Sequence, residues 1–141
     1  MPENNQILSV EGQLVGMPLA GPESFSQQQL DYLKTALGFV WLDVSEEVST
    51  SGTGLQLLYM PATGVCVLTI VRTANITGTN TLGTIPASYR PATSIISASA
   101  ALNNNAYCRG YVESTGNIGL SATASANNVG IRFFATWVVG K

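Results

Sequence analysis

Residues 129–139 read VGIRFFATWVV, the clearest alternating pattern in the chain. All odd-numbered residues of this run are apolar. An extended strand would place them together on one face, because side chains of a strand point alternately to its two sides. We therefore expect that face to be core. The other face also carries Phe134 and Val138, which are too apolar for free solvent, so we expect a neighbouring subunit to cover it.

Short alternating runs of the same kind fill the chain from residue 39 onward, separated by turn-forming Gly, Asn, Ser and Thr. Further strands are expected at 39–44, 54–60, 65–74, 93–101, 106–113 and 117–124. The pattern predicts a mainly β protein whose residues 39–141 form an antiparallel β-sandwich or barrel, a jelly-roll-like head. Within 117–124, Gly119, Ser121 and Thr123 would present a small, smooth face that lets another chain approach closely.

A short helix is expected at 25–38, before the strands begin. Ser26 can act as its N-cap, Gln29 completes a capping box, and Gly38 provides a C-terminal stop. An apolar seam on this helix consists of Leu30, Leu33 and Leu37. Three turns of helix are marginal alone, so the seam either packs on the following sheet or joins two further copies at a trimer axis, as a neck.

Residues 1–24 are rich in Pro, Gly, Asn and Glu, which is typical of an extended arm that becomes ordered on a partner. Only 10% of the 141 residues are charged, against roughly 25% in typical soluble domains. A monomer would have difficulty covering its surface with so few charges. We therefore expect a homotrimer, in which part of the surface is buried against other copies.

Catalytic chemistry is poorly represented in this sequence, which contains no histidine. The absence removes the commonest general base, the usual catalytic triads and most zinc sites. Glu46 and Glu47 are adjacent and would diverge on an extended chain, whereas a glycosidase needs two converging carboxyl groups. We expect a protein that is not an enzyme, with no cofactor and no metal site.

Nucleic-acid and membrane binding are also disfavoured. The six Lys and Arg residues are scattered singly rather than gathered in a basic stripe, and the net charge is −2. No apolar run is long enough to span a membrane, and the first fifteen residues lack the basic start of a secretory signal. Cys66 and Cys108 each lie in an apolar strand-like run, so we expect buried free thiols rather than a disulfide.

The string LGTIPASYRP at 82–91 resembles a segment of the C-terminal domains of phage tail and baseplate proteins, especially the receptor-binding heads of lactococcal siphophages. The order of landmarks over residues 52–141 also agrees. The resemblance implies a trimeric head that recognises a host cell-surface saccharide, and an arm at 1–24 that docks on another virion protein. Such a protein is made in the host cytoplasm and acts in the virion. The alternative is a virion appendage of the same fold, such as a head fibre or decoration protein, with no specific ligand.

The segment 82–91 also has a physical interpretation of its own. Pro86 and Pro91 cannot donate backbone hydrogen bonds, so we expect a rigid extended connector between sheets, held by Ile85 and Tyr89. Arg90 is held extended by the following proline, and we expect it to brace the structure rather than contact a ligand.

A candidate ligand site lies at 102–113, where the resembling heads hold saccharide. Only Arg109 matches those heads in kind. Strand alternation nevertheless places Tyr107, Arg109, Tyr111 and Glu113 in one row, beside a loop formed by Asn103, Asn104 and Asn105. Tyrosine rings stack on the apolar faces of sugars, while charged and amide groups fix hydroxyls. The row is either such a platform or a subunit contact in which Arg109 pairs with Glu113 or with a neighbour's acid.

Overall fold

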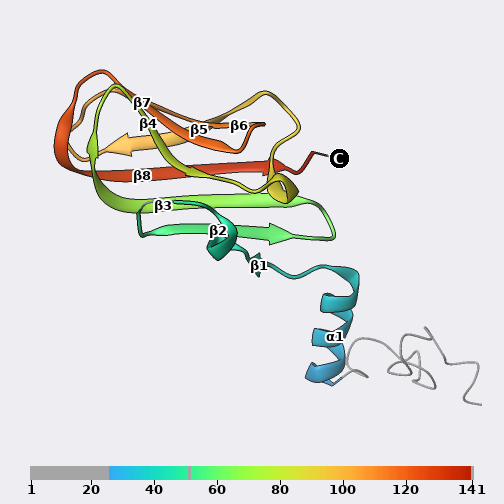
Figure 1. Ribbon diagram of the computed structural model, residues 1–141. Coiled ribbons are helices and arrows are strands. Elements are labelled where there is room, and N and C mark those ends of the chain that lie inside the picture. Colours follow the sequence, from blue (N-terminus) through green and yellow to red (C-terminus); the bar gives the residue numbers. More distant parts are fainter. Residues whose placement is uncertain (1–25, 51, 141) are drawn as a thin grey trace, which may run out of the picture. The chain divides into compact units, whose positions relative to one another are not determined.

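The computed structural model describes residues 26–50 and 52–140 (Figure 1). The chain divides into two compact units, one that ends at Val40 and one that begins at Trp41. The first contains the helix and the second contains all the strands. The arm expected at 1–24 lies outside the described residues.

The helix α1 spans Gln27–Leu37 and has both expected ends. Ser26 Oγ accepts a hydrogen bond from the backbone N–H of Gln29, and the Gln29 side chain accepts one from the Ser26 N–H, so the capping box is confirmed. Gly38 has a φ of 75° and closes the C-terminus in the left-handed conformation, as expected. No residue of α1 is buried, and Leu37 of the seam is exposed.

The β unit is a single antiparallel sheet that curls back on itself, which confirms the mainly β, antiparallel prediction. Its strands are β1 (Leu42–Asp43), β2 (Leu55–Met60), β3 (Val65–Ile76), β4 (Thr79–Thr84), β5 (Ile95–Leu102), β6 (Cys108–Glu113), β7 (Asn117–Ala122) and β8 (Ala126–Val138). They lie in the order β1-β2-β3-β8-β5-β6-β7-β4. Two 3-10 turns, η3 (Ser45–Glu47) and η4 (Ala87–Tyr89), interrupt the connections.

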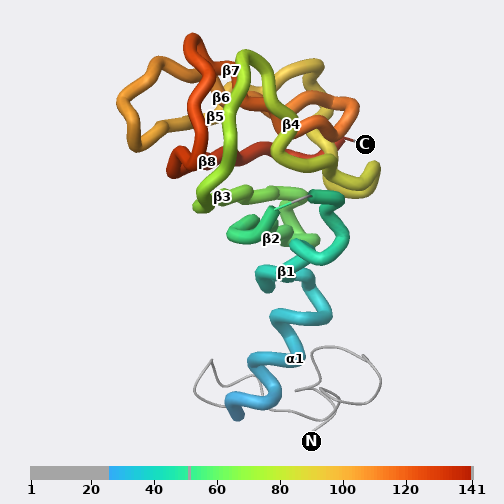
Figure 2. The backbone as a smooth tube through the Cα atoms, turned by 60° about the vertical axis from the view of Figure 1, so that its left-hand side comes forward, coloured from blue at the N-terminus to red at the C-terminus, as the bar shows by residue number. Residues whose placement is uncertain are grey.

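The sheet curls because β5 is shared between two layers. Residues 99–102 of β5 pair with β8, whereas residues 95–98 pair with β6. Figure 2 shows the resulting arrangement, with β2 and β3 in one layer and β4 and β7 in the other. The far edges approach each other where Ser49 and Thr84 exchange two backbone hydrogen bonds of 3.0 and 2.7 Å.

The hydrophobic core lies between these layers. Alternating residues of β8 supply its centre, as the sequence predicts, and Val129, Ile131, Phe133, Ala135 and Trp137 are all buried. Opposite residues of β3 and β7, including Leu68, Ile70 and Leu120, complete it. The backbone of Gly110 comes so close to Phe133 that an added Cβ would lie 2.7 Å from the ring.

Two strands differ from the sequence prediction. The run expected at 39–44 shortens to the two residues of β1, because the Asp43 carboxylate accepts the Ser45 N–H and turns the chain into η3. The strand β4 was not expected, since Thr79, Asn80 and Thr81 offer no apolar alternation. Its pairing with β7 is also irregular, with a register shift between Thr81 and Gly83.

The connector after β4 is less extended than expected, because it contains the turn η4. Ile85 is fully buried, and the Tyr89 ring lies 5.1 Å from the ring of Tyr59. Arg90 Nε donates a 2.8 Å hydrogen bond to the carbonyl of Ile85, which is the bracing role predicted for it.

Both cysteines are free thiols, as expected, but they differ in burial. Cys66 is fully buried, and desolvation raises its pKa to about 11. Cys108 is only half-buried, and its pKa is raised by the same cause.

Candidate functional site

The β unit has two outward faces that differ in chemistry. We call the outward side of β6 and its neighbours the polar face. It is defined by Ser97, Arg109, Tyr111, Glu113, Asn117, Gly119, Ser121, Thr79, Thr81 and Thr84, together with one exposed apolar residue, Ile95. We call the outward side of β2, β3, β8 and the second half of β5 the apolar face. It is defined by Leu58, Met60, Val65, Val67, Thr69, Val71, Thr73, Gly130, Arg132, Phe134, Thr136, Val138, Ser99 and Ala101, with Gln56 and Asp43 at its β1 edge. Strand pairing sets both groups, because directly paired residues point to the same side.

Tyr111 occupies the centre of the polar face. It pairs with Ser97 on one side and with Gly119 on the other. A Cβ added at Gly119 would lie 2.1 Å from Tyr111 Cζ, so the ring lies across the glycine backbone. The smooth surface expected to admit another chain is therefore filled at Gly119 by a tyrosine of the same chain. The result is a half-exposed aromatic ring that lies over the sheet at Gly119.

Arg109 and Glu113 flank Tyr111 on β6 and lie on the same face, as predicted. Four residues of strand separate them by roughly 13 Å, so they do not pair within one chain. The Glu113 carboxylate instead accepts a 2.8 Å hydrogen bond from the side-chain amide of Asn117. The Arg109 guanidinium is exposed and has no partner among the described residues.

The remaining predicted residues are Tyr107 and the three asparagines, and they lie at two different places in the fold. Tyr107 precedes β6 and is 74% exposed, and its carbonyl accepts a hydrogen bond from the Thr123 N–H. Asn103 and Asn104 hold the turn, since their side-chain oxygens accept the N–H groups of Gly130 and Ala106 at 2.9 and 3.0 Å.

Asn105 takes the left-handed conformation of that turn, with a φ of 59°. The three asparagines thus stabilise the backbone in and around the turn. Asn103 lies against β8 rather than in the row on β6.

The apolar face carries Phe134 and Val138 outward, as the alternation of residues 129–139 predicts. Val71 and Val138 are 63% and 60% exposed, and Phe134 is 46% exposed. These side chains lie on neighbouring strands, and the pairs Val65–Val138 and Thr69–Phe134 join β3 to β8. Contiguous exposed apolar surface of this kind is typical of interaction sites.

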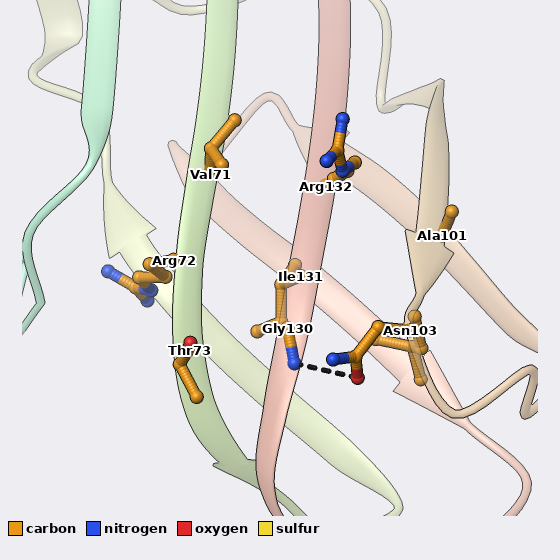
Figure 3. A pocket seen from close by; sticks show the side chains of 9 residues that line it. Val71, Arg72, Thr73, Ala101, Asn103, Gly130, Ile131 and Arg132 are labelled. Atoms are coloured by element: carbon orange, nitrogen blue, oxygen red, sulfur yellow. Dashed lines mark hydrogen bonds between the residues drawn. The ribbon is translucent and has the colours of Figure 1, made fainter.

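A groove crosses one end of the apolar face, around Gly130 (Figure 3). It has a volume of about 540 Å³ and lies between β3 and the end of β5. Its rim carries Val71, Thr73, Ala101, Asn103 and Arg132. The missing side chain at Gly130 creates the depression, and Asn103 lies so close that an added Cβ would stand 3.0 Å from its amide nitrogen.

The arginines of the β unit fall into two pairs. Arg72 donates to the Leu82 carbonyl at 2.9 Å and to Thr50 Oγ1 at 3.0 Å, and Arg90 donates to Ile85, so both connect parts of the fold. Within residues 26–50 and 52–140, Arg109 and Arg132 have no hydrogen-bond or ion-pair partner. One of these unpaired guanidinium groups lies on each outward face, where it is available to a ligand or another chain.

Acidic residues gather at the sheet edge formed by β1, η3 and the start of β2. Asp43, Glu46 and Glu47 line a hollow of about 640 Å³ there. Hydrogen bonds from the Ser45 side chain, the Ser45 N–H and Gln56 lower the pKa of Asp43. Glu47 accepts a 3.1 Å hydrogen bond from the Tyr89 hydroxyl, whereas Glu46 has no partner among the described residues.

No group of three His, Cys, Asp or Glu side chains that could hold a metal ion occurs in the part of the chain that the structure describes. No helix within the same residues has the length and apolar character needed to cross a membrane.

Comparisons with protein-family models, with curated proteins and with solved structures find no match to this chain.

Proposed function

We propose that this chain is a receptor-binding protein of a phage particle that recognises a host cell-surface saccharide through its polar face. The observation that carries the proposal is the Tyr111 ring, which lies over Gly119, with the free guanidinium of Arg109 on the same face of β6. A rigid aromatic plane flanked by charged and amide groups fits a pyranose ring, whose faces are apolar and whose rim carries hydroxyls.

Each residue of the polar face would make a different contact with the saccharide. Tyr111 stacks on the sugar, Arg109 donates to ring or exocyclic oxygens, and Glu113 with Asn117 accepts from and donates to hydroxyls. The face is shallow, so a single site should bind with roughly micromolar to millimolar affinity, about 4–8 kcal/mol. Useful adhesion then requires several sites acting together.

A homotrimer supplies that multiplicity, and three features support it. The charged fraction of the chain is low, the apolar face is uncovered, and the α1 seam has no buried residue. The apolar run continues past α1, with Phe39, Trp41 and Leu42 all exposed. Residues 1–24 would attach the trimer to another virion protein, and the protein would act outside the cell without catalysis.

The second candidate is a virion appendage, such as a head fibre or decoration protein, with no specific ligand. One observation favours it, because several polar groups near the row already have partners. Asn103 and Asn104 hold a turn, and Glu113 is bonded to Asn117. Under this alternative, the polar face is only a solvated surface.

Saccharide binding by the trimer separates the two candidates. Wild-type protein and the variants Tyr111→Ala and Arg109→Ala should be titrated with a panel of purified bacterial cell-wall polysaccharides, after light scattering confirms equal oligomeric state. We expect at least one polysaccharide to bind, and each variant to lose tenfold or more in affinity. Lys34→Ala, which also removes one positive charge but lies on α1, should bind like wild type.

If both polar-face variants bind like wild type, the polar face is not the receptor site. If no polysaccharide of the panel binds wild-type protein, the appendage becomes the better interpretation.

A further inference from the structure

We propose that the apolar face of one copy docks on the acidic edge of the next copy, with Arg132 of the face set against the Glu46 and Asp43 edge. This inference rests on the trimer in the proposed function and deepens it by naming the two surfaces and the charge pair that align them.

The first step is that the composition of the apolar face resembles the core of a protein interface rather than a surface exposed to solvent. Apart from the amide of Gln56 near the β1 edge, its outward side chains on β2, β3, β8 and β5 are aliphatic, aromatic or small hydroxyl groups, with a single charge, Arg132. Depletion of charge with retention of aromatic and Arg residues distinguishes interface cores from other surface. Val71, Phe134 and Val138 on this face expose large apolar areas.

The second step is that Arg132 lacks a counter-charge within its own β unit. Its direct neighbours across the strands are Val71 on β3 and Ala101 on β5, and neither can accept a hydrogen bond from it through a side chain. A guanidinium covered by apolar surface needs an acceptor, because an uncompensated buried charge is strongly destabilising. The partner that covers this face must therefore bring an acid.

The third step is that the same chain carries such acids at the β1 edge of the sheet, three strands away from Arg132. Of the four carboxylates among residues 41–140, Asp43, Glu46 and Glu47 lie together around one hollow at the β1 edge. Asp43 is oriented by Ser45 and Gln56, and Glu46 remains free to meet a cation. The hollow gives a guanidinium room to enter between them.

The fourth step concerns symmetry. Arg132 lies on β8, in the middle of the sheet, whereas the acids lie at the edge strand β1. When Arg132 of each copy meets the acids of the next copy, repeated in one direction, the contact is heterologous, and such contacts close into rings when the rotation permits. A ring of three satisfies each Arg132 with the acids of the next copy.

Charge reversal tests the pairing directly. Arg132→Glu should raise the concentration at which the trimer half-dissociates by tenfold or more, measured by sedimentation velocity on the full chain. Glu46→Arg should weaken it in the same direction, because two cations then meet. The double variant should recover at least part of the lost association, and circular dichroism should show an unchanged β signal in all three.

Arg109→Glu is the matched control, since it makes the same charge change on the polar face and should leave association unaltered. The inference is overturned if Arg132→Glu associates like wild type, or if the double variant is no better than the weaker single variant. A wild-type protein that is monomeric at micromolar concentration would overturn both this inference and the trimer. A normal trimer that still binds polysaccharide, with no response to charge reversal, would overturn this inference alone.

Discussion

The polar face and the apolar face are made by the same kind of antiparallel strand, and β5 contributes residues to both. On the polar face, hydroxyl, amide and charged groups surround one tyrosine, and Glu113 and Asn117 already hold each other. On the apolar face, Phe134 and Val138 are exposed, and the polar groups nearest to them in the strands are the small hydroxyls of Thr69, Ser99 and Thr136. Backbone pairing fixes which side chains point outward, but the chemistry of those side chains separates a surface suited to solvent and ligand from one that requires a cover.

The sharpest way to test this contrast compares two adjacent phenylalanines of β8. Phe133→Ala should lower the free energy of unfolding by about 3–5 kcal/mol, because Phe133 is buried between the layers. Phe134→Ala should cost about 1 kcal/mol or less at protein concentrations low enough to keep the chain monomeric, because its ring is outward on the apolar face. Urea unfolding followed by circular dichroism measures both. Equal losses would mean that the outward ring is part of a packed core.

A smaller effect should follow from filling the space beneath Tyr111. Gly119→Val should cost about 1–3 kcal/mol, because the added side chain overlaps the Tyr111 ring and forces it off the sheet. The same variant should lose polysaccharide binding if the flat ring is the platform. Gly78→Ala is the control, since an added Cβ there meets no atom within 4 Å. Normal binding by Gly119→Val would show that the position of the ring is irrelevant to the ligand.

The smallest expected effect is a difference in thiol reactivity between Cys66 on β3 and Cys108 on β6, which lie in the two layers of the sheet. At pH 8, Cys108 should react with iodoacetamide well before Cys66, because Cys66 is fully buried and burial raises its pKa to about 11. Intact-mass spectrometry with Cys66→Ala and Cys108→Ser variants identifies the modified residue. Faster reaction of Cys66 would mean that the β3 layer opens readily.

Because burial raises the pKa of Cys66, the free energy of unfolding should fall as pH rises. As pH rises, the thiol ionises in the unfolded chain near its ordinary value of 9.0 before it ionises in the folded protein. Its contribution to stability is therefore full below about pH 9 and is lost as pH approaches 11. The Cys66→Ala variant should lack this contribution in urea unfolding measured across that range.

Much of the fold could be predicted where local pattern and tertiary environment agree. The alternation of β8 predicted its buried residues, and Ser26, Gln29 and Gly38 predicted both ends of α1. The strand β4 could not be found in this way, because its stability comes from pairing with β7 and not from its own apolar pattern.

The candidate site was predictable only in part. Alternation placed Arg109, Tyr111 and Glu113 on one face, but it gave no sign that Gly119 lies beneath Tyr111, because that contact depends on the register between β6 and β7. The groove at Gly130 was missed for a similar reason. Its walls come from β3, β8 and the end of β5, which are distant in sequence.

The central position of β8 governs how quickly this chain can fold. One edge of β3 pairs with the neighbouring strand β2, but its other edge pairs with β8, where Thr136 bonds to Cys66 from 70 residues away in sequence. Closing so long a loop costs entropy before any contact repays it, and folds dominated by such pairings form in milliseconds to seconds rather than microseconds. Synthesis must pass Val138 before the middle of the sheet can assemble. Until then the apolar strands on either side present open edges, so the nascent chain should depend on chaperones to avoid aggregation.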